Sequence, residues 1–460
     1  MEIKKREHWG SKVGFVLAAA GSAIGLGNIW MFPYVTGENG GAAFVVIYLV
    51  AVLLLGLPIM IAELVIGRHT GKDPVGAFKA MLGGTGWEIV GYMGVLAGFL
   101  ILSFYSVVGG WTLGYIVKSI TGVITTLKST DAASTMFKEY TADTGSMILY
   151  HFLFISFCII IVIRGVQNGI EKASKILMPL LFLLLVALII RGVTMEGGLK
   201  GVAFFLKPDF SKITTDTVLK ALGQSFFSLS LGMGAIITYG SYLSKEDKIL
   251  HSALWIVVLD TLIAILAGLA IFPAVFAMGL DPKGGPGLIY HVIPTVFSNM
   301  NYGSVFATLF FVLLFIAALT SGISLLEVTV AYITDEKGWS RKKAVLVFGF
   351  IIFLIGIPAG LSFGVMQDVK IFMGNTFFDF LEKLTSNYML PIGGFFIAIS
   401  LGWKYGLDKT MHELDPDTRL ISLKELWAFF IKFVSPVLVL VVFVFNFSEQ
   451  IKALIKSIGN

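Results

Sequence analysis

Long apolar runs dominate this chain and limit what it can fold into. A helix needs roughly 17–25 mostly apolar residues to cross a bilayer, and the 460-residue sequence contains eleven such runs. They cover approximately 12–35, 42–67, 88–122, 147–163, 169–191, 217–242, 250–278, 303–333, 342–359, 377–401 and 427–447. We therefore predict an all-α, polytopic membrane protein with about eleven transmembrane helices.

Composition agrees with this fold class and excludes others. Charged residues make up 14% of the chain, and the mean hydropathy is +0.87, whereas soluble domains carry about 25% charged residues. Soluble enzymes, disordered chains and disulfide scaffolds are thus excluded, and the single Cys158 cannot form an intrachain bridge. The net charge of +5 does not indicate nucleic-acid binding, because the basic residues lie in loops between apolar runs. Without a phosphate-binding loop or a paired-His helix, we expect no enzyme.

The distribution of basic residues predicts the orientation in the membrane. Twenty of the 34 Lys and Arg residues fall on the side of the N-terminus when the runs are taken as alternating spans. Short loops rich in Lys and Arg favour the cytoplasmic side. We expect a cytoplasmic N-terminus, an extracellular C-terminus after eleven spans, and residence in the cell membrane.

The first and sixth runs are each interrupted in the middle by small and polar residues. The interruptions are Gly21–Asn28 (GSAIGLGN) and Ser228–Gly234 (SLSLGMG). One interpretation is that these residues only provide close helix packing. Their position five spans apart favours another, in which two inverted five-helix repeats each begin with a broken helix. Within one transporter domain, 1–460, we expect repeats at 12–191 and 217–401 and an additional helix at 427–447.

Several charged residues lie inside apolar runs, where a charge costs a few kcal/mol or more. They are Glu63, Asp260 and Glu327, together with Asp379, Glu382 and Lys383 at the outer end of run ten. Asp260 is the deepest, with no basic residue within one turn of its own helix. Each of them could belong to a structural pair, extend its side chain to the membrane surface or have a role in transport.

Oxygen-bearing groups near the interrupted runs suit a small, hard cation. Run eight carries the hydroxyls of Thr320, Ser321 and Ser324, and run one carries Asn28. Such hydroxyls often bond back to carbonyls of their own helix. They can equally join carbonyls freed by a broken helix and a buried carboxylate to coordinate Na⁺, which prefers oxygen ligands.

Four longer motifs carry a resemblance to a known family. They are Gly25–Trp30 (GLGNIW), Glu38–Gly41 (ENGG), Ser228–Gly232 (SLSLG) and Leu319–Ser321 (LTS). The chain resembles the neurotransmitter:sodium symporters over nearly its whole length, and is most similar to bacterial members that carry leucine and other hydrophobic amino acids. The resemblance implies the leucine-transporter-like fold and Na⁺-coupled symport by alternating access.

The resemblance also implies a set of site residues. The first Na⁺ would be held by the Ala23 carbonyl, Asn28, Ser228, Asp260 and the substrate carboxylate, and the second by the carbonyls of Gly21, Ile24 and Ala317 with the hydroxyls of Thr320 and Ser321. Substrate would contact Ser22, Ala23, Gly25, Leu26, Gly27, Ile101, Tyr105, Phe227, Ser228, Ser230, Met233, Ser321, Ser324 and Leu325. The inner gate would consist of Arg6 and Asp335 with Trp9 and Tyr242.

Two departures from the family pattern change these expectations. Met31 stands where many relatives pair an Arg with the acidic residue of the outer gate, here Glu382. We hypothesise that Lys383 or a water network takes the place of that Arg. Asp260 brings a fixed negative charge to the place where animal relatives require chloride, with Glu63 nearby. We therefore expect Cl⁻-independent transport, in which a proton could return on either carboxylate.

The sequence as a whole predicts a symporter that moves two Na⁺ ions with a hydrophobic L-amino acid across a lipid bilayer. An apolar lining with an adaptable Met233 suits branched aliphatic and aromatic side chains. A proton-coupled carrier, a carrier of another solute and an amino-acid sensor that does not transport stay open as alternatives. The preferred amino acid, the Na⁺ stoichiometry and the oligomeric state are not determined by the sequence.

Overall fold

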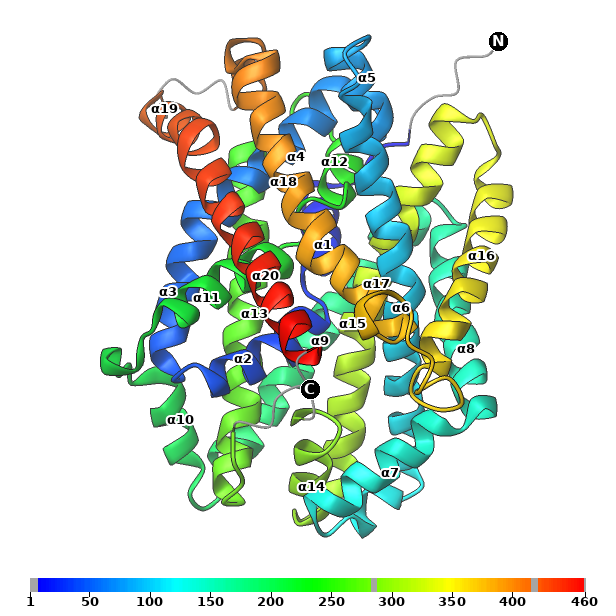
Figure 1. The fold of residues 1–460 in the computed structure, drawn as a ribbon, viewed down its shortest axis with the longest axis vertical. Coiled ribbons are helices and arrows are strands. Elements are labelled where there is room, and N and C mark those ends of the chain that lie inside the picture. Colours follow the sequence, from blue (N-terminus) through cyan, green and yellow to red (C-terminus); the bar gives the residue numbers. More distant parts are fainter. Residues whose placement is uncertain (1–6, 283–287, 415–420, 459–460) are drawn as a thin grey trace.

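The computed structural model describes residues 7–282, 288–414 and 421–458, which form a bundle of helices without strands in those ranges (Figure 1). Nine helices in the described ranges are long and apolar enough to cross a membrane. A tenth span is a pair, Lys12–Ala23 and Gly27–Glu38, bent by 54°. The broken sixth run supplies the eleventh, so the predicted fold class is confirmed.

The spans follow the predicted apolar runs closely. In chain order they contain α1 (Lys12–Ala23) with α2 (Phe32–Glu38), α3 (Ala42–Ala51) with α4 (Leu57–Thr70), α6 (Glu88–Ile120), α8 (Thr144–Val162), α9 (Lys172–Val193), α11 (Thr215–Ser228) with α12 (Ala235–Gly240), α13 (Ile249–Ala277), α15 (Gly303–Glu336), α16 (Arg341–Leu361), α17 (Phe377–Lys383) with α18 (Leu390–Ile399), and α19 (Ile421–Phe429) with α20 (Ser435–Ile458).

Four shorter helices lie between the spans and were not predicted. They are α5 (Pro74–Leu82), α7 (Thr130–Ala142), α10 (Gly198–Leu206) and α14 (Val292–Ser298). Helices α7 and α14 lie at one end of the bundle, and α5 and α12 lie at the other (Figure 1). Local capping explains some of them: the Asp73 side chain accepts from the N–H groups of Val75 and Gly76 at the start of α5.

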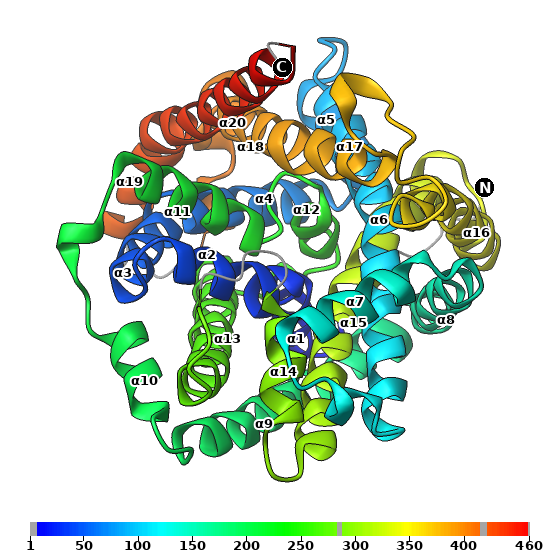
Figure 2. The same ribbon diagram turned by 60° about the horizontal axis from the view of Figure 1, so that its bottom comes forward.

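Helices α6 and α15 pack against each other along the centre of the bundle. In α15, 83% of the most apolar stretch is buried, against 28% for the span Val166–Val193, which lies at the rim. Figure 2 shows α1 and α2 inside a ring of the other spans, with α16 and α20 at the periphery. The interrupted helices therefore lie inside the protein, where other helices can satisfy their freed backbone groups.

The first break follows α1 directly. Ile24 adopts an extended conformation (φ −71°, ψ 96°), its N–H donates to the Ala20 carbonyl, and the helix resumes at Gly27 as a π turn. Glycine lowers helix propensity by about 1 kcal/mol relative to alanine. The three glycines at positions 21, 25 and 27 thus weaken the helix where it ends.

The second break separates α11 from α12. Ser230, Gly232 and Gly234 have φ angles of 54°, 81° and 75°, values that favour glycine and that a helix does not contain. The two breaks touch, since the Ser230 hydroxyl donates to the Ser22 carbonyl at 2.9 Å. Both predicted broken helices are therefore confirmed.

The tight backbone of the second break gives a stability prediction. A Cβ at Gly232 would lie 2.3 Å from the Leu390 carbonyl oxygen, whereas a Cβ at Gly86, with a similar φ of 79°, would meet nothing within 4 Å. We expect Gly86→Ala to lower stability by the positive-φ cost alone, about 1–2 kcal/mol. Gly232→Ala should add an overpacking cost of about 1–3 kcal/mol. Thermal unfolding in detergent micelles measures both, and equal midpoints for the two variants would argue against the close approach.

Candidate functional site

A buried carboxylate connects the two broken helices. Asp260, in the middle of α13, accepts two hydrogen bonds on its side chain: from Asn28 Nδ2 at 2.8 Å and from Ser228 Oγ at 3.1 Å. The same Asn28 amide donates to the Asp260 carbonyl at 3.1 Å. Tyr48 of α3 donates to the Ser228 hydroxyl at 3.2 Å, and all four residues are buried. Three residues expected at the first Na⁺ site thus lie together.

The residues expected at the second Na⁺ site also lie together, between α1 and α15. Thr320 Oγ1 is 3.0 Å from the Ala317 carbonyl and 3.4 Å from the Ile24 carbonyl, and Ser321 Oγ is 3.5 Å from Ile24. A Cβ at Gly21 would lie 3.3 Å from the Thr320 Cβ. Thr320 Oγ1 also lies 3.1 Å from the Ile316 carbonyl, four residues earlier. Its hydroxyl therefore bonds back to its own helix and also lies near a carbonyl freed by the first break.

Backbone donors of the first break face a tyrosine. The Leu26 N–H donates to the Tyr105 hydroxyl at 3.3 Å, and the Gly25 N–H donates to Asn28 Oδ1 at 3.3 Å. A Cβ at Gly25 would lie 2.5 Å from Ser321 Oγ and 3.0 Å from the Tyr105 hydroxyl. Only glycine permits this approach, which brings backbone N–H groups next to polar side chains.

An open cavity of about 500 Å³ leads toward this break. Four of the predicted substrate contacts, Leu26, Gly27, Tyr105 and Phe227, are among its lining residues. The other predicted contacts are buried and not part of that lining: Ser22, Ala23, Gly25, Ile101, Ser228, Ser230, Met233, Ser321, Ser324 and Leu325. The cavity therefore approaches the site from the side of α7 and α14 and ends before it reaches most of the predicted substrate contacts.

A chain of hydroxyls closes the region below the cavity. Ser22 Oγ donates to Ser324 Oγ at 2.7 Å, and both Ser230 and Ser321 donate to the Ser22 carbonyl, at 2.9 and 3.1 Å. Beside it, a Cβ at Gly98 would lie 3.7 Å from the carbonyl oxygens of both Met233 and Leu325. The predicted substrate residues on α1, α6, the second break and α15 thus surround one small region.

Comparison with known proteins supports the resemblance. The model of the sodium:neurotransmitter symporter family matches residues 6–141 and 133–456. An uncharacterised sodium-dependent transporter of Bacillus subtilis, YhdH, is 40% identical over 444 residues, which cover 96% of this chain and 98% of that protein. The crystal structure of MhsT in complex with L-phenylalanine superposes with a TM-score of 0.87 at 46% identity, covering 96% and 99% of the two chains.

The chain belongs to the sodium:neurotransmitter symporter family. It is accordingly a sodium-dependent, multi-pass membrane symporter and not an enzyme.

Two further polar residues support the breaks of this symporter. Glu63 of α4 is fully buried and accepts from the Gly232 N–H at 2.7 Å, so it satisfies a donor that the unwound segment leaves free. Gln224 of α11 donates to the Gly27 carbonyl at 3.1 Å. Sequence reasoning singled out Glu63 but missed Gln224, although a Gln inside an apolar run was a signal for it.

On the cavity side, Met31 and Glu382 line the opening. Lys383, one of the two candidates to replace the missing Arg, donates instead to Asn375 Oδ1 at 2.6 Å. The structure therefore gives Lys383 a hydrogen-bond partner other than Glu382, and its role at the outer gate stays a prediction.

At the opposite end, aromatic groups cover the site. Trp9 Nε1 donates to the Tyr239 carbonyl at 3.0 Å, and the Trp9 ring lies edge-on to Tyr242, with centroids 6.2 Å apart. Asp335 accepts from the Asp73 N–H at 3.2 Å. Burial, with the nearby Asp335 charge, raises the pKa of Asp73, in the loop between spans two and three, to about 7. The expected partner of Asp335, Arg6, lies outside the described residues.

Tyr242 leads to an ion pair that the sequence did not reveal. Its hydroxyl donates to Glu327 Oε1 at 2.7 Å, and Arg341 binds both carboxylate oxygens of Glu327, at 3.1 and 2.5 Å. Glu327 is fully buried. Arg341 is the first residue of α16. In the sequence it lies in a charged stretch between two apolar runs, which gave no sign that its side chain reaches into the protein.

This ion pair predicts a strong effect of removing one partner. Arg341→Gln leaves the Glu327 carboxylate buried without its cation, which costs about 3–5 kcal/mol. We expect a clearly lower midpoint of thermal unfolding and partial recovery in the double variant with Glu327→Gln. The exposed Lys342→Gln is the matched control. A normal midpoint for Arg341→Gln would mean that the pair does not stabilise the protein.

Proposed function

We propose that this protein couples Na⁺ to the uptake of hydrophobic L-amino acids by alternating access. The observation that carries the proposal is the Asp260 carboxylate, which is fully buried where the broken helices meet. Within the described residues it has hydrogen bonds from Asn28 and Ser228 but no ion pair. A buried carboxylate without a compensating cation is costly. A Na⁺ ion bound there, with the Ala23 carbonyl as a further ligand, would supply the missing charge.

A second Na⁺ would bind between α1 and α15, next to Thr320. Its ligands would be the carbonyls of Gly21, Ile24 and Ala317 and the hydroxyls of Thr320 and Ser321. These are neutral oxygen ligands, which suit a monovalent hard cation. Each net positive charge that moves inward gains about 2.3 kcal/mol per 100 mV of membrane potential.

The amino acid would bind across the breaks by its two charged groups. Free N–H groups at the start of a helix attract anions, and free carbonyls at its end attract cations. The carboxylate would therefore meet the N–H groups of Leu26 and Gly27 and the Tyr105 hydroxyl, and would complete the first Na⁺ site. The ammonium would face carbonyls at Ala23, Phe227 and Ser228.

The substrate side chain would occupy an apolar pocket. Its expected walls are Ile101, Phe227, Met233 and Leu325, with Ser324 and Ser230 as the few polar groups. Such walls favour branched aliphatic and aromatic side chains. The MhsT structure, described as a complex with L-phenylalanine, supports this class of substrate.

Transport should not require chloride, because Asp260 already supplies a negative charge at the first Na⁺ site. Glu63 lies on the other side of the second break and is bonded to Gly232. Either carboxylate could carry a proton back after the Na⁺ ion leaves.

We also propose two inverted repeats, 12–191 and 217–401, followed by an additional helix at 427–447. We propose a cytoplasmic N-terminus and an extracellular C-terminus. The cavity beside α7 and α14 would then open to the outside, and the Trp9 side would face the cytoplasm.

Ion replacement tests the coupling. In proteoliposomes that contain the purified protein, we expect uptake of labelled L-leucine and L-phenylalanine to be lost when choline replaces Na⁺. Uptake should stay unchanged when gluconate replaces chloride. Loss of uptake in gluconate would refute chloride independence, and failure of both amino acids to enter in Na⁺ would refute the substrate class.

The role of Asp260 can be tested by removing only its charge. Asp260→Asn keeps the shape of the side chain, and we expect the apparent Na⁺ affinity to fall by about tenfold or more, a loss of at least ~1.4 kcal/mol. Asp216→Asn is the matched control, since Asp216 is half-exposed and pairs with Lys220 in the first turn of α11. The Na⁺ dependence of L-phenylalanine uptake is the measurement, and equal Na⁺ affinities for the two variants would exclude Asp260 as a ligand.

A further inference from the structure

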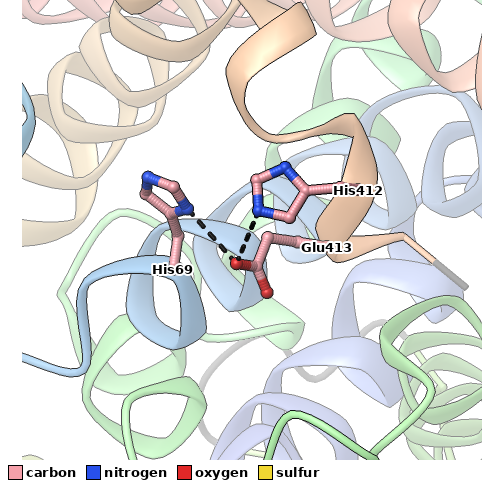
Figure 3. Close-up of side chains that lie close together, drawn as sticks. All are labelled: His69, His412 and Glu413. Carbon is pink, nitrogen blue, oxygen red and sulfur yellow. Dashed lines mark hydrogen bonds and ion pairs between the residues drawn. The ribbon is translucent and has the colours of Figure 1, made fainter.

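Two histidines and a glutamate come together far from the transport site, at the end of the bundle that carries α12. His69 lies in the last turn of α4, and His412 and Glu413 lie in a 3₁₀ turn, Met411–Glu413, between spans ten and eleven. Figure 3 shows both imidazole rings directed at the same Glu413 oxygen. That oxygen, Oε1, is 3.2 Å from His69 Nδ1 and 3.3 Å from His412 Nε2.

We propose that this cluster is a Zn²⁺ site. Imidazole nitrogen and carboxylate oxygen are zinc ligands at about 2.0–2.2 Å, and two ligands of a tetrahedral ion at that distance lie ~3.3 Å apart. Both measured separations have this value, and the three ligand atoms all lie within 4.8 Å of one another. The His412 side chain is 64% exposed, so it can move to close the remaining gap. Its exposure also leaves the fourth position to water.

Outer partners already hold two of the three ligands. Tyr405 Oη lies 2.9 Å from His69 Nε2, the ring nitrogen that would not bind the metal. Arg68 Nε donates to the other carboxylate oxygen of Glu413 at 2.9 Å, and a second nitrogen of Arg68 donates to the Glu413 carbonyl. Such contacts orient metal ligands and contribute strongly to metal affinity. When zinc takes Nδ1, the Nε2–H can donate to the Tyr405 hydroxyl, which serves as donor or acceptor.

Replacing Lys245 can distinguish a zinc site from a cluster that is held together only by ion pairs. Its ammonium lies 2.8 Å from Glu413 Oε1, the oxygen shared by the two histidines, and its side chain is 68% exposed. Zinc and the ammonium would therefore compete for the same oxygen. Removal of the lysine charge should strengthen zinc binding, whereas it should only weaken a network held together by ion pairs.

The test uses the full-length protein in detergent micelles after removal of any His tag. Isothermal titration with ZnCl₂ gives the affinity, and the visible spectrum of bound Co²⁺ reports the coordination geometry. We expect wild-type protein to bind one Zn²⁺ and Tyr405→Phe to bind about tenfold more weakly, as outer-shell changes do. His412→Ala, which removes a ligand, should lose more than that. Lys245→Met should bind more tightly than wild type.

His251→Ala is the matched control, because His251 is an exposed histidine on α13 outside the cluster, and it should bind zinc like wild type. The proposal is overturned if wild-type protein binds no zinc, if His412→Ala and His251→Ala bind equally well, or if Lys245→Met weakens binding. Thermal unfolding of each variant without metal verifies that it is folded. Because the cluster lies apart from the transport site, transport by wild-type protein does not bear on this result.

Discussion

The hydrogen bonds that Asn28 and Ser228 donate to the buried Asp260 carboxylate are the interaction on which the transport site depends. Asn28 follows the break between α1 and α2, and Ser228 ends α11 just before the other break. A charge in the protein interior holds its polar neighbours far more strongly than it would in water. One carboxylate on α13 therefore fixes both unwound segments at the same depth. In the proposed function, a bound Na⁺ ion compensates this charge.

The surrounding helices satisfy the polar groups that unwinding exposes. Glu63 accepts from Gly232, Gln224 donates to the Gly27 carbonyl, and Tyr105 accepts from Leu26. In each contact, a side chain from another helix binds a backbone group at a break. The unwound segments therefore have hydrogen-bond partners although they are not helical. An open cavity on one side and the aromatic cover of Trp9 on the other give the two ends different access to the site. A carrier that alternates between two openings needs this asymmetry.

The sequence predicted the spans and the helix breaks, because each of these depends on residues that are close together in the chain. Apolar length determined the spans, and the glycines at positions 21, 25, 27, 232 and 234 marked both breaks. Gly232 and Gly234 have positive φ angles, which few other residues tolerate. Contacts between distant side chains were not predictable in this way. Arg341 reaches Glu327 across a loop, Tyr48 supports Ser228 over 180 residues, and Lys383 binds Asn375. These pairings depend on how each helix is oriented about its own axis, and a uniformly apolar span gives no information on that orientation. The short helices α7 and α10 lie outside the apolar runs, so span length gave no sign of them.

In the proposed function, the amino-acid carboxylate is itself a ligand of the first Na⁺ ion, so the binding of the two must be linked. Equilibrium binding of labelled L-phenylalanine at several Na⁺ concentrations, together with ²²Na⁺ binding at several L-phenylalanine concentrations, measures this linkage most directly. We predict that each ligand raises the affinity for the other by the same factor, as reciprocity requires. L-phenylalanine binding that is equally tight in Na⁺ and in choline would contradict a shared site between the two broken helices.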